Sequence, residues 1–397
     1  MKKLLIAGGS YADLPLIRAA KKLGFHVTTS GNRPEDLGHT ESDDYAPCDY
    51  SDHGSVLALA RTLDVDALCA CCNDFSALSC AYAAAEMGLP GHDSLETSRV
   101  IHHKDEWRAF ADSYNIPSPR AISCRSIKEV ELAIKHLCFP LIVKPVDMTG
   151  GKGIRRVDNT SEVIVAAEAA LAASKAKRIV VEEFITGTRH GFTAMLRDRR
   201  VVFHFTDNEH YHLSPYLVSG ASAPTSCPET AVQELVEYSQ KIANELCLVD
   251  GIFHVQFILT ESGEPIIIEI CRRSPGDLYP ELVRYATGAP YAEWIVRSSC
   301  GLGIPEVRQF PVKKNVTRHC LMTYDYGVVE GFDFEPVIES EIIDRLIWGK
   351  RGDEVHDPDT YKAGIVFIQH KEKAVMCHVI PQLQKLLAVR VKKMSEK

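Results

Sequence analysis

The apolar positions in the first part of the chain switch repeatedly between short runs and helical spacing. The segments "KKLLIAGGS" and "FHVTTSG" are short apolar runs that end at glycine, as buried strands do, and "LPLIRAAKKLG" between them has helical spacing. The alternation continues through "VLALARTLD", "DALCACC" and "ALSCAYAAAEMGLP". This repetition predicts a parallel sheet with helices on both faces, in a first domain that ends near Gly91.

The middle of the chain predicts a mixture of helices and strands. The segment "SLETSRVIHHKDEWRAFADSYNIPSP" has the pattern of one helix that starts at Ser94–Thr97 and is stopped by Pro117 and Pro119. Further helices are expected in "EVELAIKHLCFP", "SEVIVAAEAALAASKAK" and "AVQELVEYSQKIANELCL", and further strands in "LIVKP" and "RIVVEEFI". After about residue 306 the pattern changes to short strands, which end in an expected hairpin, "GIVFIQHKEKAVMCHVI".

The strongest hairpin signal is "GIFHVQFILTESGEPIIIEICRR", two β-rich runs joined at Ser262–Gly263. If these two residues form the loop, Gln256 lies opposite Glu269 and His254 opposite Cys271. Strand side chains alternate, so one face is expected to be polar and the other apolar. The polar face would hold Gln256, His254, Glu269, Cys271 and Arg273, and the apolar face Val255, Phe257, Ile268 and Ile270.

Composition limits the classes of function. The chain has 397 residues, of which 45% are hydrophobic and 25% charged, as in an ordinary globular protein of two or three domains. The formal net charge is −8 and the short basic tail "VRVKK" is typical of a solvated end, so we expect no nucleic-acid partner. No apolar run is long enough for a signal peptide or a membrane span, which predicts a cytoplasmic protein with no membrane partner.

Two patterns that suggest chemistry have simpler explanations. The 13 cysteines include Cys69 and Cys72 in a C-x-x-C pattern, but this pattern lies in a predicted buried strand, so reduced core thiols are favoured over a redox or zinc site. Gly8 and Gly9 follow the first strand as a dinucleotide fingerprint would. The third glycine of that fingerprint is missing, so we interpret the pair as a structural turn.

The segment "KPVDMTGGKG", from Lys144 to Gly153, places two lysines around three glycines. Backbone N–H groups of such a loop can point at phosphate oxygens because no Cβ blocks the approach. It does not match the G-x-x-x-x-G-K-[ST] pattern, and on its own it is equally typical of a basic surface turn. The polar hairpin face favours the phosphate interpretation, since Gln256 and Glu269 offer oxygen ligands that suit Mg²⁺. Zinc at His254 and Cys271 is less favoured, because two more ligands are not evident.

The ordered motifs resemble a known superfamily. Lys104 in "HHKDEW", Lys144 in "LIVKP", the loop "TGGKG", and then "VVEEFITGTRH", "HVQF" and "IIEICRR" resemble the ATP-grasp superfamily, in particular the carboxylate–amine ligase type that also includes biotin carboxylase. The resemblance spans roughly residues 1–305. It implies an α/β and α+β multidomain fold: a Rossmann-like domain at 1–91, an ATP-grasp domain at 92–305 with subdomains at about 92–181 and 182–305, and a small β-rich domain at 306–397.

The resemblance also implies roles for particular residues. Lys104 and Lys144 would contact the phosphates of ATP, and the loop Thr149, Gly150, Gly151, Lys152 and Gly153 would close over them. In the "VVEEFI" segment, which holds Glu182, Glu183, Phe184 and Ile185, Glu182 would accept a hydrogen bond from the adenine amino group, and the backbone at Phe184 and Ile185 would pair with the ring edge. His190 stands where a ribose-binding residue is usual. Glu269 and Gln256 would hold Mg²⁺, and Arg273 would steady the phosphoryl group or the substrate carboxylate.

Two positions depart from the superfamily pattern. Gln256 stands where a glutamate is usual, and Cys271 replaces an asparagine. An amide oxygen brings no charge, and sulfur is a poor ligand for Mg²⁺. The structural alternative for Arg273 is an ion pair with Asp277 or Glu281.

The activity expected is ATP-dependent joining of a small-molecule carboxylate to an amine through an acyl phosphate, with ATP and Mg²⁺ as cofactors. Three alternatives stay open: a carboxylase-like enzyme that uses bicarbonate, a non-catalytic ATP-binding sensor, and a nicotinamide-dependent oxidoreductase built on the first domain. The region from "HFTDNEHYHLSPYLVSG" to "SPGDLYP" is the place to look for substrate contacts, because it is rich in His, Tyr, Asp and Glu, but its individual residues are more typical of a polar surface loop. The segment after residue 306 is expected either to cap this pocket or to form the surface of a homodimer.

Overall fold

A computed structural model describes residues 1–148, 151–304 and 306–393, and the described chain divides into two compact units. The first unit comprises Met1–Phe205, Cys227–Gly276 and Tyr291–Gln309, and the second comprises Thr206–Ser226, Asp277–Pro290 and Phe310–Lys397. The mixed α/β and α+β class predicted from the sequence is confirmed. The bounds of the three domains drawn from the sequence stay a prediction.

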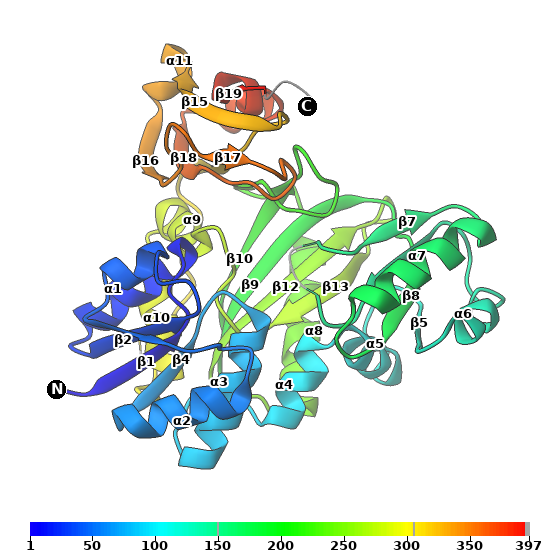
Figure 1. The fold of residues 1–397 in the computed structure, drawn as a ribbon, viewed down its shortest axis with the longest axis horizontal. Helices are drawn as coiled ribbons and strands as arrows, with labels where there is room; N and C mark the ends of the chain where they lie inside the picture. The colour runs from blue at the N-terminus through cyan, green and yellow to red at the C-terminus, as the bar shows by residue number, and fades with distance from the viewer. Residues whose placement is uncertain (149–150, 305, 394–397) are drawn as a thin grey trace. The chain divides into compact units, whose positions relative to one another are not determined.

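The predicted parallel sheet forms at the start of the first unit. It has the order β3-β2-β1-β4, and every neighbouring pair is parallel. The strands are β1 (Lys3–Ala7), β2 (His26–Gly31), β3 (Asp44–Pro47) and β4 (Ala67–Ala70). Helices α2 (His53–Leu63) and α3 (Asp74–Met87) pack on one face, and α1 (Leu14–Lys22) packs on the other with α10 (Tyr291–Ser299), which returns from much later in the chain (Figure 1).

The glycine pair after β1 packs against the chain's own side chains. A Cβ added to Gly8 would lie 2.2 Å from Cβ of Cys71, and one added to Gly9 would lie 2.1 Å from Cε1 of His39. The next residue, Ser10, caps a short 3-10 helix (Tyr11–Asp13), and its side chain accepts from the Ala12 N–H. Both glycines are therefore needed to let His39 and Cys71 approach the backbone, as in a structural turn.

The single helix predicted after residue 94 is wrong, because the chain forms two. Helix α4 (Leu95–His102) starts at the predicted cap, where the Ser94 hydroxyl accepts from the Thr97 N–H. His103 is extended, with φ −99° and ψ 120°, and α5 (Lys104–Ser113) begins after it. The break changes the direction of the chain between His102 and Lys104, and both of these side chains reach polar groups described below.

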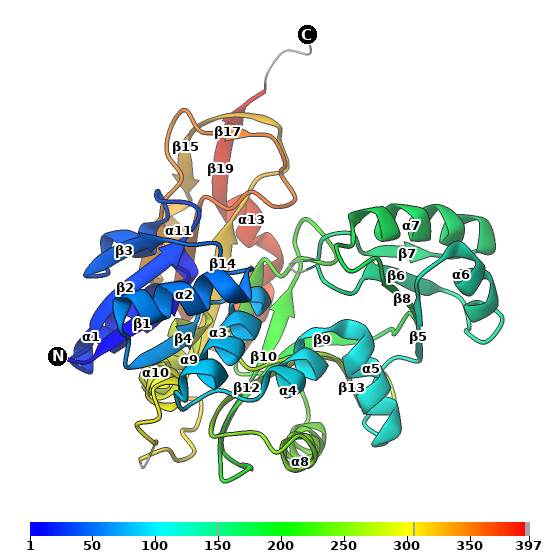
Figure 2. The same cartoon turned by 60° about the horizontal axis from the view of Figure 1, so that its bottom comes forward.

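A small antiparallel sheet with the order β5-β8-β6-β7 follows. Its strands are β5 (Ala121–Cys124), β6 (Leu141–Pro145), β7 (Arg155–Val157) and β8 (Ile179–Glu183), and helices α6 (Ile127–Ala133) and α7 (Thr160–Ala173) cover one face (Figure 2). Leu141 and Val143 of β6 pack under these helices. Alternation along the strand therefore places Lys144 on the opposite face, together with Glu182 of β8.

The predicted central hairpin forms, but its turn differs from the prediction. Strands β12 (Gly251–Leu259) and β13 (Pro265–Cys271) are joined by a longer loop, in which Gly263 has φ +87°. Near the loop Leu259 pairs with Pro265, one residue out of the predicted register. A β-bulge after Gln256 restores the register.

Because of this bulge, the predicted pairs Gln256–Glu269 and His254–Cys271 are correct. The apolar face is not as predicted at one position, since Ile267 packs in the core and Ile268 is only half-buried. The hairpin continues into β9 (Thr188–Arg197) and β10 (Arg200–His210), and α5 and α8 (Glu229–Glu245) supply side chains to the same core.

The second unit contains the last part of β10 and mostly short strands, as predicted. The strands are β11 (Gly220–Ala223), β14 (Asn315–Leu321), β15 (Gly327–Phe334), β16 (Ile342–Ile347), β17 (Glu354–Val355), β18 (Gly364–His370) and β19 (Leu387–Lys392). The helices are α9 (Tyr279–Thr287), α11 (Pro336–Glu339), α12 (Lys373–Val379) and α13 (Leu383–Leu386). The hairpin predicted over residues 364–380 is wrong in its second half, which is α12. There Met376 packs with Ile380 and Leu383 at helical spacing.

Asp207 is fully buried in the second unit, where the Tyr279 hydroxyl donates to its Oδ1 at 2.5 Å. Burial, followed by the nearby charge of Glu209, raises the pKa of Asp207 to about 8. The folded protein therefore binds a proton here that the unfolded chain releases above about pH 4. This stabilisation is complete below the unfolded pKa and is lost as the pH rises through about 8.

We expect Asp207→Asn to raise the melting temperature at pH 8.5 and to change it little at pH 5, because asparagine accepts the same hydrogen bond without ionising. Thermal unfolding of both proteins at the two pH values measures this effect. Asp333→Asn, at an exposed ion pair with Arg390, is the matched control and should show no such difference. Equal shifts at both pH values for Asp207→Asn would contradict the assignment.

No helix in the described ranges is long and apolar enough to cross a membrane. All 13 cysteines are free thiols. Cys69 lies in the buried strand β4 as predicted, and burial raises the pKa of its thiol, but Cys72 lies beyond the end of that strand.

Candidate functional site

The first unit brings Lys104 and Glu269 together from distant parts of the chain. Lys104 is the first residue of α5, and its Nζ donates to the Met148 carbonyl at 2.8 Å and lies 3.4 Å from Oε1 of Glu269. Glu269 stands opposite Gln256 in the hairpin, and about a third of its side chain is exposed. Met148 immediately precedes the glycine loop, so the lysine, the carboxylate and the start of the loop meet at one place.

A second cation lies on the same face of the small sheet as Glu182. Lys144 Nζ donates to Glu182 Oε1 at 2.6 Å, and both side chains are almost fully buried. Burial lowers the pKa of Lys144 to about 8, although Glu182 opposes the shift. The contact with Glu182 therefore favours the charged form of Lys144 in a place where burial disfavours it.

Arg108 completes this buried group and was not predicted from the sequence. Its Nε donates to Glu182 Oε2 at 3.0 Å, and its Nη1 donates to the Ile268 carbonyl at 2.8 Å. Burial disfavours the ionised form of Glu182, but Arg108 and then Lys144 hold its pKa below the ordinary value. Arg108 thus ties α5, β8 and the bulge of β13 together. Its position four residues after Lys104, on the same side of a helix, is the signal in the sequence that could have identified it.

The described part of the glycine loop is a turn. Gly151 and Gly153 have φ +73° and +72°, values that L side chains rarely adopt, and Lys152 between them is exposed. Thr149 and Gly150 lie outside the described residues. The turn therefore needs glycine at two positions and presents a lysine to solvent.

The segment after β8 supplies main-chain groups. Glu183 accepts from the Cys138 N–H at 2.9 Å, and the Phe184 N–H donates to the Pro140 carbonyl at 2.9 Å. The Ile185 N–H makes no hydrogen bond within the described residues. The Phe184 ring lies under the Arg156 guanidinium, 4.7 Å from its centre.

His190 is buried on β9, and its ribose-binding role stays a prediction. It lies on the core side of β9 and is 1% exposed. Its Nε2 is 2.7 Å from the Thr188 hydroxyl, and its ring stacks on Phe257 at 5.3 Å.

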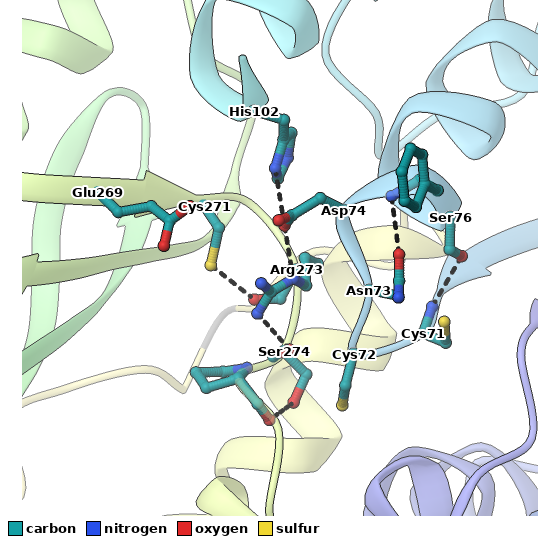
Figure 3. Close-up of polar contacts among 12 residues, drawn as sticks. Cys71, Cys72, Asn73, Asp74, Ser76, His102, Glu269, Cys271, Arg273 and Ser274 are labelled. Carbon is teal, nitrogen blue, oxygen red and sulfur yellow. Dashed lines mark hydrogen bonds and ion pairs between the residues drawn. The ribbon is translucent and has the colours of Figure 1, made fainter. Parts of the chain in front are cut away.

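Arg273 follows the hairpin and forms an ion pair that the sequence did not indicate. Its Nε lies 2.8 Å from Oδ1 of Asp74 (Figure 3). The partner is therefore neither Asp277 nor Glu281, the two acids considered from the sequence. Asp74 also contacts Nδ1 of His102 at 3.0 Å. The location of Asp74, at the carboxyl end of β4 in a parallel sheet, is where functional side chains of such sheets gather, and this was the available signal.

Cys271 is buried, and its thiol donates to the Arg273 carbonyl at 3.6 Å. Burial raises the pKa of Cys271 to about 11, so the group is a neutral thiol. Among the described residues no cluster of three or more His, Cys, Asp or Glu side chains has the geometry to hold a metal ion. The oxygen donors at the hairpin are therefore the Glu269 carboxylate and the Gln256 amide.

Comparison with known proteins gives a consistent result. Residues 103–307 match the family model for the "Carbamoyl-phosphate synthase L chain, ATP binding domain". A carbamoyl phosphate synthase large chain from Methanothermobacter thermautotrophicus is 25% identical over 264 residues, which cover 64% of this chain and 24% of that protein. This chain thus spans about a quarter of the length of that relative.

Solved structures share the fold across almost the whole chain. The L-amino acid ligase from Bacillus licheniformis has a TM-score of 0.82 at 19% identity, with 99% of each chain covered. The biotin carboxylase domain of the 2-oxoglutarate carboxylase from Hydrogenobacter thermophilus, solved with MgADP and bicarbonate, has a TM-score of 0.78 at 18% identity. That match covers 98% of this chain and 91% of the domain.

Proposed function

This chain belongs to the family of the carbamoyl-phosphate synthase L chain ATP-binding domain, whose model matches more than half of it, and from that premise we propose that it is an ATP-dependent ligase that joins a small-molecule carboxylate to an amine. The resemblance to the ATP-grasp superfamily is confirmed. The observation that carries the proposed activity is the meeting of Lys104 with Glu269 beside the glycine loop, which combines a cation and a carboxylate where phosphates and a metal must be held together.

The donors at the hairpin suit Mg²⁺. Mg²⁺ is usually held by one or two carboxylates together with substrate phosphates, and it keeps several waters. Glu269 supplies the carboxylate and Gln256 an uncharged amide oxygen, opposite each other in the hairpin. When bound, the metal would neutralise negative charge on the phosphates. Cys271 takes no part, because it is a neutral, buried thiol.

We assign ATP to the face that carries Lys144. Lys104 and Lys144 contact the phosphates, and Gly151, Lys152 and Gly153 close over them with Thr149 and Gly150. Lys144 and Arg108 each bind one oxygen of the Glu182 carboxylate, so we propose that Glu182 orients Lys144. The main chain of Phe184–Ile185 then contacts the edge of the adenine ring. Glu183 holds that segment through Cys138.

The reaction proceeds in two displacements. An oxygen of the substrate carboxylate attacks the γ-phosphorus of ATP, the bond to the β-phosphate oxygen breaks, and ADP leaves. The amine nitrogen then attacks the acyl carbon, and phosphate leaves with that carboxylate oxygen as the amine loses a proton. Arg273 and the lysines offset the charge that gathers as two anions meet. Closure of the glycine loop excludes water, which would hydrolyse the acyl phosphate.

Lys152→Ala is expected to lower kcat for ADP formation by about 10–100-fold while the affinity for ATP changes little, because the exposed lysine gains its contacts only when the loop closes. Steady-state kinetics and ATP titration separate the two effects. Lys128→Ala is the matched control, because Lys128 is an exposed lysine of α6, a helix that packs on the small antiparallel sheet. Equal turnover in Lys152→Ala and wild type would remove the loop from the mechanism.

The function is tested by ADP release with ATP and Mg²⁺ across a panel of carboxylic acids and amines that includes bicarbonate. ADP that appears only with one acid–amine pair supports the ligase. ADP release that depends on bicarbonate without any other acid would support a carboxylase instead. ATP binding with no ADP release across the panel would support a sensor. The substrates are small molecules in this proposal, and the homodimer and the cytoplasmic location stay predictions.

A further inference from the structure

The Arg273 guanidinium is anchored on one side and open on the other. Its Nε donates to Oδ1 of Asp74 at 2.8 Å, and its Nη1 donates to the Ser274 carbonyl at 3.2 Å. Its Nη2 makes no hydrogen bond to any described residue. The preceding residue, Arg272, differs. It donates to Asp93 and to the carbonyls of Val249 and Ile252, so all its nitrogens are used within the protein.

Asp74 is held in place by the turn that follows β4. The Asn73 side chain caps α3 by accepting from the Phe75 N–H at 3.0 Å. The Cys71 N–H donates to Ser76 Oγ at 3.1 Å (Figure 3). That hydroxyl in turn donates to the Ala7 carbonyl of β1 at 2.6 Å. Asp74 is the first residue of α3, so its carboxylate projects from a fixed turn at the end of the parallel sheet.

His102 holds Asp74 from the other side. It is the last residue of α4, which packs against α3, and its side chain points toward Asp74 (Figure 3). Its Nε2 is buried with no hydrogen-bond partner in the described part of the chain. It lines a cavity of about 30 Å³ together with Asp93, Arg272 and Arg273. A polar space of that size has room for about two waters, which would complete the hydrogen bonds of His102.

Asp74 keeps its charge in this buried place. Burial alone would raise its pKa, but Arg273 and then His102 outweigh burial and hold the pKa below its ordinary value. The ion pair is therefore present across the working pH range, and the guanidinium cannot rotate without breaking it.

We propose that Asp74 and His102 are positioning residues for the ligase reaction. Asp74 fixes the Arg273 guanidinium so that its open Nη2 edge meets the carboxylate or phosphoryl oxygen of the substrate, and His102 fixes Asp74. This inference rests on the proposed function for the reaction itself. It gives the first parallel sheet a role in the reaction, through the position of Arg273.

Positioning and simple charge supply lead to different kinetics. Asp74 partly neutralises the charge of Arg273. Its removal leaves a guanidinium whose positive charge attracts substrate anions more strongly but whose position is no longer fixed. Asp74→Ala should lower kcat by about 10²-fold, because a displacement of about 1 Å is enough for a loss of that size. The KM for the acid should stay the same or fall. Asp74→Asn should retain more of kcat than Asp74→Ala, because Asn keeps an acceptor for Arg273. His102→Asn should likewise retain part of kcat, because its side-chain amide can donate to Asp74 as Nδ1 of His102 does.

Asp93→Ala is the matched control. Asp93 is an equally buried acid paired with the neighbouring Arg272 at 2.8 Å, and it does not contact Arg273. Its removal should lower the melting temperature by an amount similar to Asp74→Ala and leave kcat unchanged. The proposal is overturned if Asp74→Ala and Asp93→Ala have the same kcat, or if the loss in Asp74→Ala appears only in KM.

A second measurement does not depend on any substrate. Melting temperatures of Asp74→Ala, Arg273→Ala and the double variant form a cycle, and the contact predicts that the double variant loses much less than the two single losses combined. Additive losses overturn the positioning of Arg273 by Asp74, whatever the activity assay shows. The two tests can also disagree. If the losses are not additive but the wild-type protein forms no ADP with any acid–amine pair, the ligase function is rejected while the anchoring of Arg273 by Asp74 stands.

Discussion

Glu269→Ala is expected to abolish ADP release, with a loss of about 10³-fold or more in kcat, and this is the largest catalytic effect the structure predicts. Glu269 is the one carboxylate at the hairpin that faces Gln256, and it also contacts Lys104. Its removal takes away the only charged oxygen donor of that pair and leaves Lys104 with the Met148 carbonyl but without the Glu269 carboxylate. Steady-state ADP release with saturating ATP and Mg²⁺ measures the effect.

The control for this substitution is Glu261→Ala, which removes an exposed carboxylate from the loop of the same hairpin and should leave kcat unchanged. Glu269→Gln should retain the shape of the site and still lose most activity, because an amide brings no charge to a pair that already contains Gln256. Turnover of Glu269→Ala within a few-fold of wild type would mean that the phosphates and the metal are held elsewhere.

Glu182→Ala is expected to be the most destabilising single substitution at the site. Glu182 is the counter-charge of two buried cations, Lys144 at 2.6 Å and Arg108 at 2.9 Å. Removing one partner of a buried ion pair costs about 3–5 kcal/mol, because the remaining charge stays buried and unpaired. Here two cations remain, so we expect a fall in melting temperature on the order of 10 °C.

Lys144→Met tests the asymmetry of this group. It leaves Arg108 paired with Glu182, so its loss of melting temperature should be much smaller than that of Glu182→Ala, although it should weaken ATP binding strongly. Glu168→Ala, at an exposed acid of α7 on the same small sheet, is the control and should change the melting temperature little. Equal losses for Glu182→Ala and Lys144→Met would show that the charge balance described here does not stabilise the fold.

Local patterns were sufficient to predict the elements but not all their ends. The pairing of Gln256 with Glu269 was correct although the predicted loop was wrong, because the longer loop and the bulge shift the register by one residue in opposite senses. Alternation alone cannot reveal a bulge, and for that reason Ile268 was placed on the core face that Ile267 occupies. The segment that forms α12 has apolar residues at both strand and helix spacing, and its packing on Ile380 and Leu383 decides the outcome.

The residues missed at the site share one property: each acts through a contact with a distant part of the chain. Arg108 reaches Glu182 and Ile268, and Asp74 reaches Arg273 across 199 positions of sequence. A sequence shows such residues only as ordinary polar positions on a helix or after a strand. His102 was missed for the same reason, since it reaches Asp74 from α4, 28 positions further along the sequence.

The most direct test of the account uses an acid labelled with ¹⁸O in its carboxylate, once the panel has identified an acid–amine pair. An acyl phosphate formed by attack of the acid on the γ-phosphate transfers one labelled oxygen to the phosphate that is released. We predict one ¹⁸O per phosphate, formed in step with ADP and with the amide product. Unlabelled phosphate, produced at the same rate as ADP, would show that water cleaves the ATP and would contradict the ligase mechanism.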